Sequence, residues 1–289
     1  MKQKKLYFIT LVVLFLSYLF MGGDCSTNDD EEIPPPDNSV AAPGSFTFKV
    51  EAEAGGDSKV TFNWTSSSDE NDTDFKGYRI ITVEVDSNGN VTFIFQEQAL
   101  SKTIKSHSIN PLERGKRFKT FVLAERNNGI KSDSLETEIY AGVFYNVDGE
   151  IDSYVSVGSS MSGFGWNISN GVGTQYPYTQ SNSNKIDLHV RELSDVPYFF
   201  SPGGLDPGFK LTRIKNIGSG QEAFDETDLP EADETFLEIN LGDVYLVKTQ
   251  ELYYAKIWIK NIDPPNALRA YYIIQFDYKL QPIKNLRIL

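Results

Sequence analysis

The stretch Lys59-Val60-Thr61-Phe62-Asn63-Trp64 decides the fold of the first half of the chain, because polar and apolar residues alternate along it. Successive side chains of a β-strand point to opposite faces, so Val60, Phe62 and Trp64 share one face. The pattern predicts a strand that buries this face in a core. Similar β-prone runs lie on both sides, separated by turn residues such as Asn88-Gly89. Seven short strands in about 95 residues are typical of a small β-sandwich.

Two further stretches support this prediction: Asp74-Phe75-Lys76-Gly77-Tyr78 and Leu112-Glu113-Arg114-Gly115-Lys116-Arg117-Phe118. Together with Trp64 they resemble a fibronectin type III domain, in which the tryptophan is buried on strand B and the two stretches lead into strands C and F. The resemblance covers residues 44–142 and implies an immunoglobulin-like sandwich. It places Phe118 at a corner that usually holds a tyrosine, so this corner lacks the usual hydroxyl.

Four carboxylates lie close together in the loop before the predicted strand C: Asp69, Glu70, Asp72 and Asp74. Carboxylate oxygens are ligands that Ca²⁺ prefers, so calcium binding is one interpretation of this loop. The pattern of an EF-hand is absent, and acidic residues are common in this loop of the resembled family. We therefore expect no metal site. Arg126 stands where the family commonly has an asparagine.

The composition argues against several classes of function. The formal net charge is -13, from 27 Lys and Arg against 40 Asp and Glu. A chain of this sign repels phosphate backbones, so no nucleic-acid partner is expected. Cys25 is the only cysteine, so we expect neither an intrachain disulfide nor a cysteine-rich zinc site. No cofactor is predicted.

The N-terminal segment has the pattern of an export signal. Three lysines among the first five residues precede the apolar run Leu6–Met21, which is shorter than the ~20 residues that a membrane span needs. The segment resembles a bacterial lipoprotein signal, which implies removal of residues 1–24 and lipid attachment to Cys25. Asp24 departs from the small residue that is usual before the cleavage point. An ordinary secreted protein is the alternative.

Residues 25–43 are predicted to be an acidic, proline-rich tether. Asn28-Asp29-Asp30-Glu31-Glu32 resembles the export signal of surface lipoproteins in the Bacteroidota, and its alternative meaning is a solvated linker. Pro34-Pro35-Pro36 favours an extended, stiff spacer. We expect a protein anchored in the outer membrane through the lipid on Cys25 and facing the cell exterior, with the periplasm as the alternative.

Residues 143–289 are predicted to form a second antiparallel β-sandwich. Tyr254–Lys260 and Ala270–Leu280 both alternate, and Asp263-Pro264-Pro265-Asn266 between them predicts a hairpin. Leu241–Thr249 is expected to pair beside it. These runs resemble a C-terminal β-module of Bacteroidota surface lipoproteins. Some proteins of that group scavenge haem through paired histidines.

Rings set among glycine, asparagine and threonine suggest a ligand surface in Gly163-Phe164-Gly165-Trp166-Asn167 and Tyr176-Pro177-Tyr178. Aromatic faces can stack on sugar rings while amides bind the hydroxyls. Trp166, Tyr176 and Tyr178 are therefore the candidate ligand-binding residues. The interpretation that carries more weight is that Trp166 and Phe164 are core residues and that the tyrosines pack a loop; substitution of Trp166 distinguishes the two.

No catalytic residue is predicted. The chain has two histidines, His107 and His189, in different halves, which supports neither a haem pair nor a catalytic triad. His189 lies in an alternating run and is expected to be a half-exposed structural residue. The acidic run from Glu222 to Glu234 contains enough carboxylates for a glycosidase pair, but a solvated loop is its commoner meaning.

The sequence therefore predicts an all-β chain with a fibronectin type III-like sandwich followed by a second antiparallel sandwich. The leading functional hypothesis is a non-enzymatic surface lipoprotein with a binding or adhesion role and a glycan or protein ligand. The alternatives are a structural or assembly subunit of an outer-membrane complex, and a polysaccharide-degrading enzyme.

Overall fold

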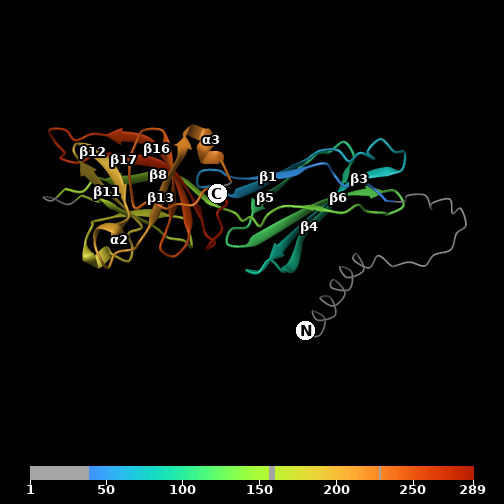
Figure 1. The fold of residues 1–289 in the computed structure, drawn as a ribbon, viewed down its shortest axis with the longest axis horizontal. Coiled ribbons are helices and arrows are strands. Elements are labelled where there is room, and N and C mark those ends of the chain that lie inside the picture. Colours follow the sequence, from blue (N-terminus) through green and yellow to red (C-terminus); the bar gives the residue numbers. More distant parts are fainter. Residues whose placement is uncertain (1–38, 156–159, 228) are drawn as a thin grey trace, which may run out of the picture. The chain divides into compact units, whose positions relative to one another are not determined.

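The computed structural model describes residues 39–155, 160–227 and 229–289. Within these ranges the chain builds four antiparallel sheets (Figure 1). Cys25, the predicted signal peptide and the tether up to Asn38 lie outside the described residues. In the part of the chain that is described, no helix has the length and hydrophobicity to cross a bilayer.

The first half of the chain forms two sheets, with strand orders β1-β2-β5 and β4-β3-β6-β7. Their strands are β1 (Phe46–Ala52), β2 (Ser58–Trp64), β3 (Phe75–Val85), β4 (Val91–Ser101), β5 (Ser106–Leu112), β6 (Arg117–Arg126) and β7 (Leu135–Glu136). Seven strands divided in this way form a fibronectin type III-like sandwich. The fold predicted for the first half is confirmed.

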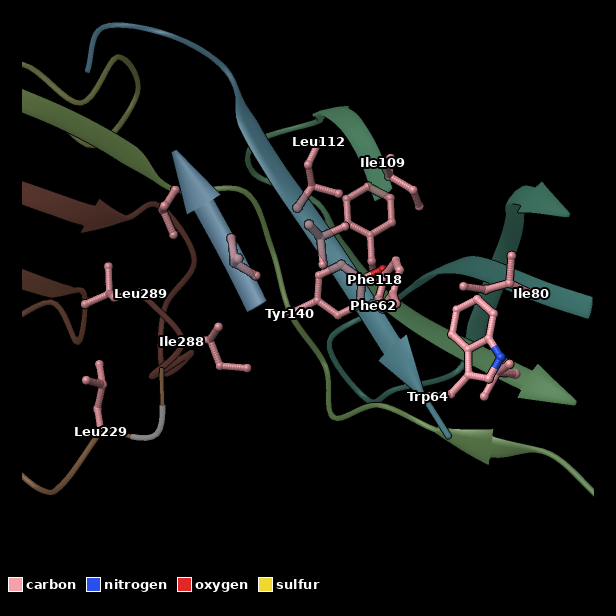
Figure 2. Packing of buried hydrophobic residues seen from close by; sticks show 14 of the residues in the cluster. Phe62, Trp64, Ile80, Ile109, Leu112, Phe118, Tyr140, Leu229, Ile288 and Leu289 are labelled. Carbon is pink, nitrogen blue, oxygen red and sulfur yellow. The ribbon is translucent and has the colours of Figure 1, made fainter. Parts of the chain in front are cut away.

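The alternation in β2 has the predicted consequence. Val60 and Phe62 are 0% exposed and Trp64 is 3% exposed, and all three belong to the first core cluster (Figure 2). Phe118 is fully buried at the corner where the family has a tyrosine. A different tyrosine, Tyr140, supplies a buried hydroxyl nearby. This hydroxyl forms a hydrogen bond of 2.6 Å with Thr120 Oγ1.

The last residues of the predicted tether pack on this sandwich. Val40 is 6% exposed and belongs to the first core cluster. The backbone N–H of Ala41 donates to Asp69 Oδ2 at 2.9 Å, and the Ser67 hydroxyl donates to the Ala41 carbonyl at 2.6 Å. The chain is therefore held by the sandwich from about residue 40 onwards.

The second half forms two five-stranded sheets, with strand orders β10-β9-β11-β12-β14 and β13-β15-β16-β17-β8. Their strands are β8 (Phe144–Asp152), β9 (Gly163–Trp166), β10 (Gly173–Tyr176), β11 (Leu188–Leu193), β12 (Val196–Phe200), β13 (Arg213–Ser219), β14 (Phe236–Glu238), β15 (Asp243–Lys248), β16 (Tyr254–Asp263) and β17 (Ile273–Gln281). The predicted hairpin is β16–β17, and β15 pairs beside it as expected. The second β-sandwich is thus confirmed.

The two sheets of the second half enclose the second core cluster, which includes Phe164, Phe199, Tyr245 and Phe276. The first core cluster also takes in residues of the second half, namely Val143, Leu229, Ala232, Leu246, Tyr254, Ile288 and Leu289. Figure 2 shows three of them, Leu229, Ile288 and Leu289. Apolar side chains from after residue 142 therefore help to bury the first sandwich. The boundary between residues 142 and 143 stays a prediction.

Irregular segments cover the outer sides of the second sandwich. They contain a 3-10 helix, Gln180–Asn182, and the short helices α2 (Pro202–Leu205) and α3 (Gly220–Asp225). Beneath α3, Lys256 of β16 pairs in register with Lys279 of β17. Both ammonium groups donate to the Phe224 carbonyl, at 2.8 and 3.0 Å. Burial lowers the pKa of Lys256 to about 7.

Candidate functional site

Trp166 lies inside the second core and not on its surface. Its side chain is 8% exposed and meets Phe164 and Tyr278 edge-on, with ring centroids 5.4 and 6.2 Å apart. A buried indole cannot offer its face to a sugar ring. Of the two interpretations of Trp166, the structure favours the core residue over the ligand surface.

The glycines beside Trp166 have a packing role. A Cβ atom on Gly165 would lie 1.8 Å from the Lys185 carbonyl oxygen, and one on Gly163 would lie 2.6 Å from the Ile186 side chain. Only glycine allows the segment at 185–187 to lie this close to β9. The glycine-rich context that suggested a ligand surface is thus explained by close backbone approach.

The two candidate tyrosines, Tyr176 and Tyr178, have different surroundings. Tyr176 ends β10 and is half-buried, with the Lys185 ammonium 5.7 Å from its ring centroid. Tyr178 is also half-buried and stacks between two rings, His189 at 3.8 Å and Phe209 at 4.5 Å. Its hydroxyl donates to Asp206 Oδ2 at 2.8 Å. Tyr178 therefore lies on the outer side of the sheet that contains β11, because it stacks on His189, which faces away from the core.

His189 is more buried than expected. It is 1% exposed, and its Nδ1 lies 2.9 Å from the Ser162 carbonyl oxygen. Burial lowers the pKa of His189 to about 4, because the charged imidazolium would lose its hydration. The ring is covered by Tyr178 and by Tyr154, whose centroid lies 5.9 Å away. His189 is a neutral, structural residue near pH 7.

The outer side of β11, β12 and β14 carries an aromatic surface that the covering segments leave partly open. Register pairs place Phe200 between His189 of β11 and Phe236 of β14. Phe200 stacks on Phe236 with centroids 5.7 Å apart, and Tyr198 lies 6.3 Å from Phe200. We call Tyr198, Phe200 and Phe236 the aromatic ledge.

Exposure increases along this surface from β11 towards β14. His189 is 1% exposed, Phe200 is 8% exposed and Phe236 is 53% exposed. Beside the ledge, Tyr198 pairs in register with Arg191 on one side and with Glu238 on the other, and both charged residues are exposed. The ledge therefore combines one exposed ring, Phe236, and the half-buried Tyr198 with charged groups of both signs.

A buried ion pair supports the same sheet. Lys210 Nζ lies 2.9 Å from Asp187 Oδ1, and the Asp187 side chain is 3% exposed. Asp187 Oδ2 accepts the backbone N–H of Trp166 at 3.1 Å. Burial raises the pKa of Asp187, although Lys210 and this N–H act in the opposite direction. The pair fastens the segment after α2 to the outer side of β9.

The carboxylates of the acidic loop in the first sandwich form ion pairs with basic side chains of the protein. The Arg126 guanidinium forms ion pairs with Asp69 at 3.1 Å, with Asp72 at 3.0 Å, and with Asp74. Glu70 instead pairs with Lys105 at 2.8 Å. Across the described ranges no group of three metal-binding side chains is gathered. Arginine at this position thus gives the loop carboxylates a partner from the protein itself.

Two carboxylates of the acidic run that begins in α3 are paired with basic side chains. Asp225 pairs with Lys279 at 3.0 Å and Glu231 with Lys248 at 2.5 Å. Burial of Asp225 acts to raise its pKa, but hydrogen bonds from Gln221 and Lys279 outweigh it and hold the pKa below its usual value. The hydrogen bond from Lys248 likewise lowers the pKa of Glu231. A glycosidase acid requires a shift in the opposite direction.

No protein-family model and no curated protein sequence matches the chain. Among solved structures it is similar to the third fibronectin III domain of the human KIAA0343 protein, with 17% identity, a TM-score of 0.28, and coverage of 40% of this chain and 92% of that chain. It is also similar to the twitchin kinase region from C. elegans, with 12% identity, a TM-score of 0.25, and coverage of 82% of this chain and 39% of that chain. The assignment of the fold rests on the strand orders described above and not on these scores.

Proposed function

We propose that this protein is a non-enzymatic, lipid-anchored surface protein of the outer membrane that binds glycan on the aromatic ledge. The observation that carries the binding proposal is the exposed ring of Phe236, which stacks on the buried Phe200 and lies near the half-buried Tyr198 and the exposed Glu238 and Arg191. Recognition sites typically combine aromatic faces with a few polar groups that fix orientation. The anchor rests on the signal-like segment that ends at Cys25.

Retention of the full chain on immobilised polysaccharides tests the binding proposal. We expect Phe236→Ala to weaken retention roughly tenfold, the equivalent of about 1.4 kcal/mol, and Tyr198→Ala to weaken it as well. The thermal melt should stay the same, because Phe236 is 53% exposed. Leu241→Ala is the matched control, since Leu241 is an exposed apolar residue (65%) outside the ledge.

Two results would overturn the glycan proposal. One is unchanged retention in both ledge variants. The other is a wild-type chain that no polysaccharide retains and that instead captures a protein in a ledge-dependent manner. Release of new reducing ends from a polysaccharide, abolished by changing one acidic residue, would overturn the non-enzymatic part.

The anchor has a separate test. Mass spectrometry of the mature N-terminus should find Cys25 acylated, and Cys25→Ser should release the protein from membranes, because two or more acyl chains are needed for firm anchoring. An unacylated N-terminus would overturn the anchor while leaving the ledge proposal intact.

A further inference from the structure

β4 (Val91–Ser101) is an edge strand with an open side. It ends the order β4-β3-β6-β7, and among the described strands it is hydrogen-bonded to β3 alone. Its first half exposes large apolar side chains, with Val91 at 44%, Phe93 at 62% and Ile94 at 40%. An edge of this kind presents free N–H and C=O groups to an incoming strand.

An apolar groove lies next to the same strand. It has a volume of about 410 Å³ and is lined by Phe95, Leu112 and Pro111, with Asp57, Glu113 and Arg114 around them. Phe95 packs on the core residue Phe118 with centroids 5.1 Å apart. Phe93 of β4 pairs in register with Glu84 of β3, and Glu84 pairs in turn with Phe118 of β6. Phe93 therefore lies on the same face of the sheet as Phe118. Phe93 and Phe95 therefore share the inward side of β4, one as an exposed ring and one as a wall of the groove.

We propose that β4 pairs antiparallel with β4 of a second copy of this chain. A two-fold axis through Ile94 places Phe93 of each copy opposite Phe95 of the other, at the mouth of its groove. Such a contact is isologous, because the same ring and the same groove are used twice. The pairing joins the four-stranded sheets of the two copies into one.

Like-charge repulsion opposes a second copy least at the first half of this strand. The chain carries a net charge of -13, so two copies repel each other in general. Residues 87–96 contain no charged side chain, whereas the next residue, Glu97, is charged. The two-fold axis pairs residues 92–96 of one copy with the same residues of the other, so only uncharged side chains meet there, and Glu97 lies opposite the apolar Val91. Neither copy needs to bring a complementary charge.

The assembly closes as a dimer. At the opposite edge of the sheet β7 has only two residues, Leu135–Glu136, which is too short to template another strand. The register of β4 on β3 shifts at Thr82/Val83 and at Glu84/Val85. Such bulges increase local twist and limit pairing to a short segment. A continuing filament is therefore not expected.

Sedimentation equilibrium of the full chain in density-matched detergent tests the proposal. We expect a dimer for the wild type and at least roughly tenfold weaker association for Phe93→Lys and for Ile94→Lys. Each variant places a like charge at the axis and removes an apolar contact. Leu268→Lys is the control, because Leu268 is 99% exposed in the β16–β17 turn, and it should remain dimeric.

Cross-linking supplies a second measurement that does not depend on the lysine variants folding. Ile94→Cys should give a disulfide-linked dimer, whereas Val147→Cys, at 44% exposure, should not; both retain Cys25. A monomeric wild type overturns the proposal, even if the edge captures a strand of another protein. Dimers that persist in both lysine variants, or equal cross-linking of the two cysteine variants, also overturn it.

Discussion

The two sandwiches differ in what covers the outer sides of their sheets. In the first, the outer side of β3 and β6 carries an ion-pair network in which the partly exposed Arg79 bridges Glu97 and the buried Glu125, and Lys76 also pairs with Glu125. In the second, chain segments lie over both sheets, so His189, Asp187, Lys256 and Lys279 are all buried. Alternation in sequence therefore predicts exposure better in the first sandwich, where Glu125 keeps exposed partners, than in the second, where His189 and Lys256 are 1% and 0% exposed.

This difference in burial affects the stability of each sandwich. A buried charged or titratable group is stable only when its hydrogen bonds are replaced by the protein. The second sandwich does this with the Phe224 carbonyl for its two lysines and with Lys210 for Asp187. It should consequently be more sensitive than the first to the loss of one partner and to pH.

The largest expected effect is that of Trp166→Ala. Removing a buried indole leaves a cavity, and such changes cost about 3–5 kcal/mol. The matched change Phe236→Ala, on the exposed end of the ledge, should alter stability by no more than about 0.5 kcal/mol. Urea unfolding followed by circular dichroism measures both. Equal effects of the two changes would contradict the placement of Trp166 in the core and Phe236 on the surface.

The next effect compares one ion pair from each sandwich. Lys210→Met leaves the Asp187 carboxylate buried without its cation and should cost about 3 kcal/mol. Arg79→Met should cost about 1 kcal/mol, because Glu125 keeps Lys76 at 2.7 Å. Urea unfolding of the two variants gives the difference. A larger loss for Arg79→Met would reverse the comparison.

Acid should destabilise the protein through His189. The unfolded imidazole takes up a proton near its ordinary pKa of 6.5, but the folded one resists until about 4. The unfolded state thus binds more protons in this window, so stability is lost as pH falls from about 6.5 towards 4. The loss should reach about 2 kcal/mol between pH 7 and pH 5.

Thermal melts of His189→Gln and His107→Gln measure this effect. His189→Gln should flatten the slope between pH 7 and pH 4. His107→Gln, in the first sandwich, should flatten it less, because His107 has a lowered pKa but is only half-buried. An unchanged slope in His189→Gln would contradict the burial argument. Lys256, whose pKa falls to about 7, contributes its own loss as pH drops from 10.5 towards 7, outside this window.

The smallest effect is expected for Arg126→Gln. Without the guanidinium, Asp69, Asp72 and Asp74 repel one another, and the loop should loosen slightly. Because these side chains face water, the drop in melting temperature should be small and should shrink at high salt. A drop that is independent of salt would mean that Arg126 acts through packing.

The strands and cores were largely predictable because their signals are local. Val60, Phe62 and Trp64 alternate at the period of a strand, and Asp263-Pro264-Pro265-Asn266 ends one strand and starts another. For Trp166 the sequence left two interpretations open, a core residue and a ligand surface. Glycines next to a ring suit both a ligand surface and close backbone packing, and only the position of Lys185 decides between the two.

The ledge was predictable only in part. Tyr198 and Phe200 stand out as a pair of rings, but Phe236 lies in a three-residue strand after an acidic run. It becomes part of the surface because β14 pairs with β12 across a long separation in sequence. No local pattern marks a partner of that kind.

By itself the sequence determined the all-β class, the fibronectin type III-like order of the first half, the terminal hairpin and the signal-like segment before Cys25. These depend on periodicity, turn residues and composition, which act over a few residues. The tertiary structure alone decided that Trp166 is core, that Lys256 and His189 are buried, and that Phe93 stands exposed beside a groove. Each of these outcomes depends on whether a segment distant in sequence packs over the side chain, and no pattern within a few residues reports such packing.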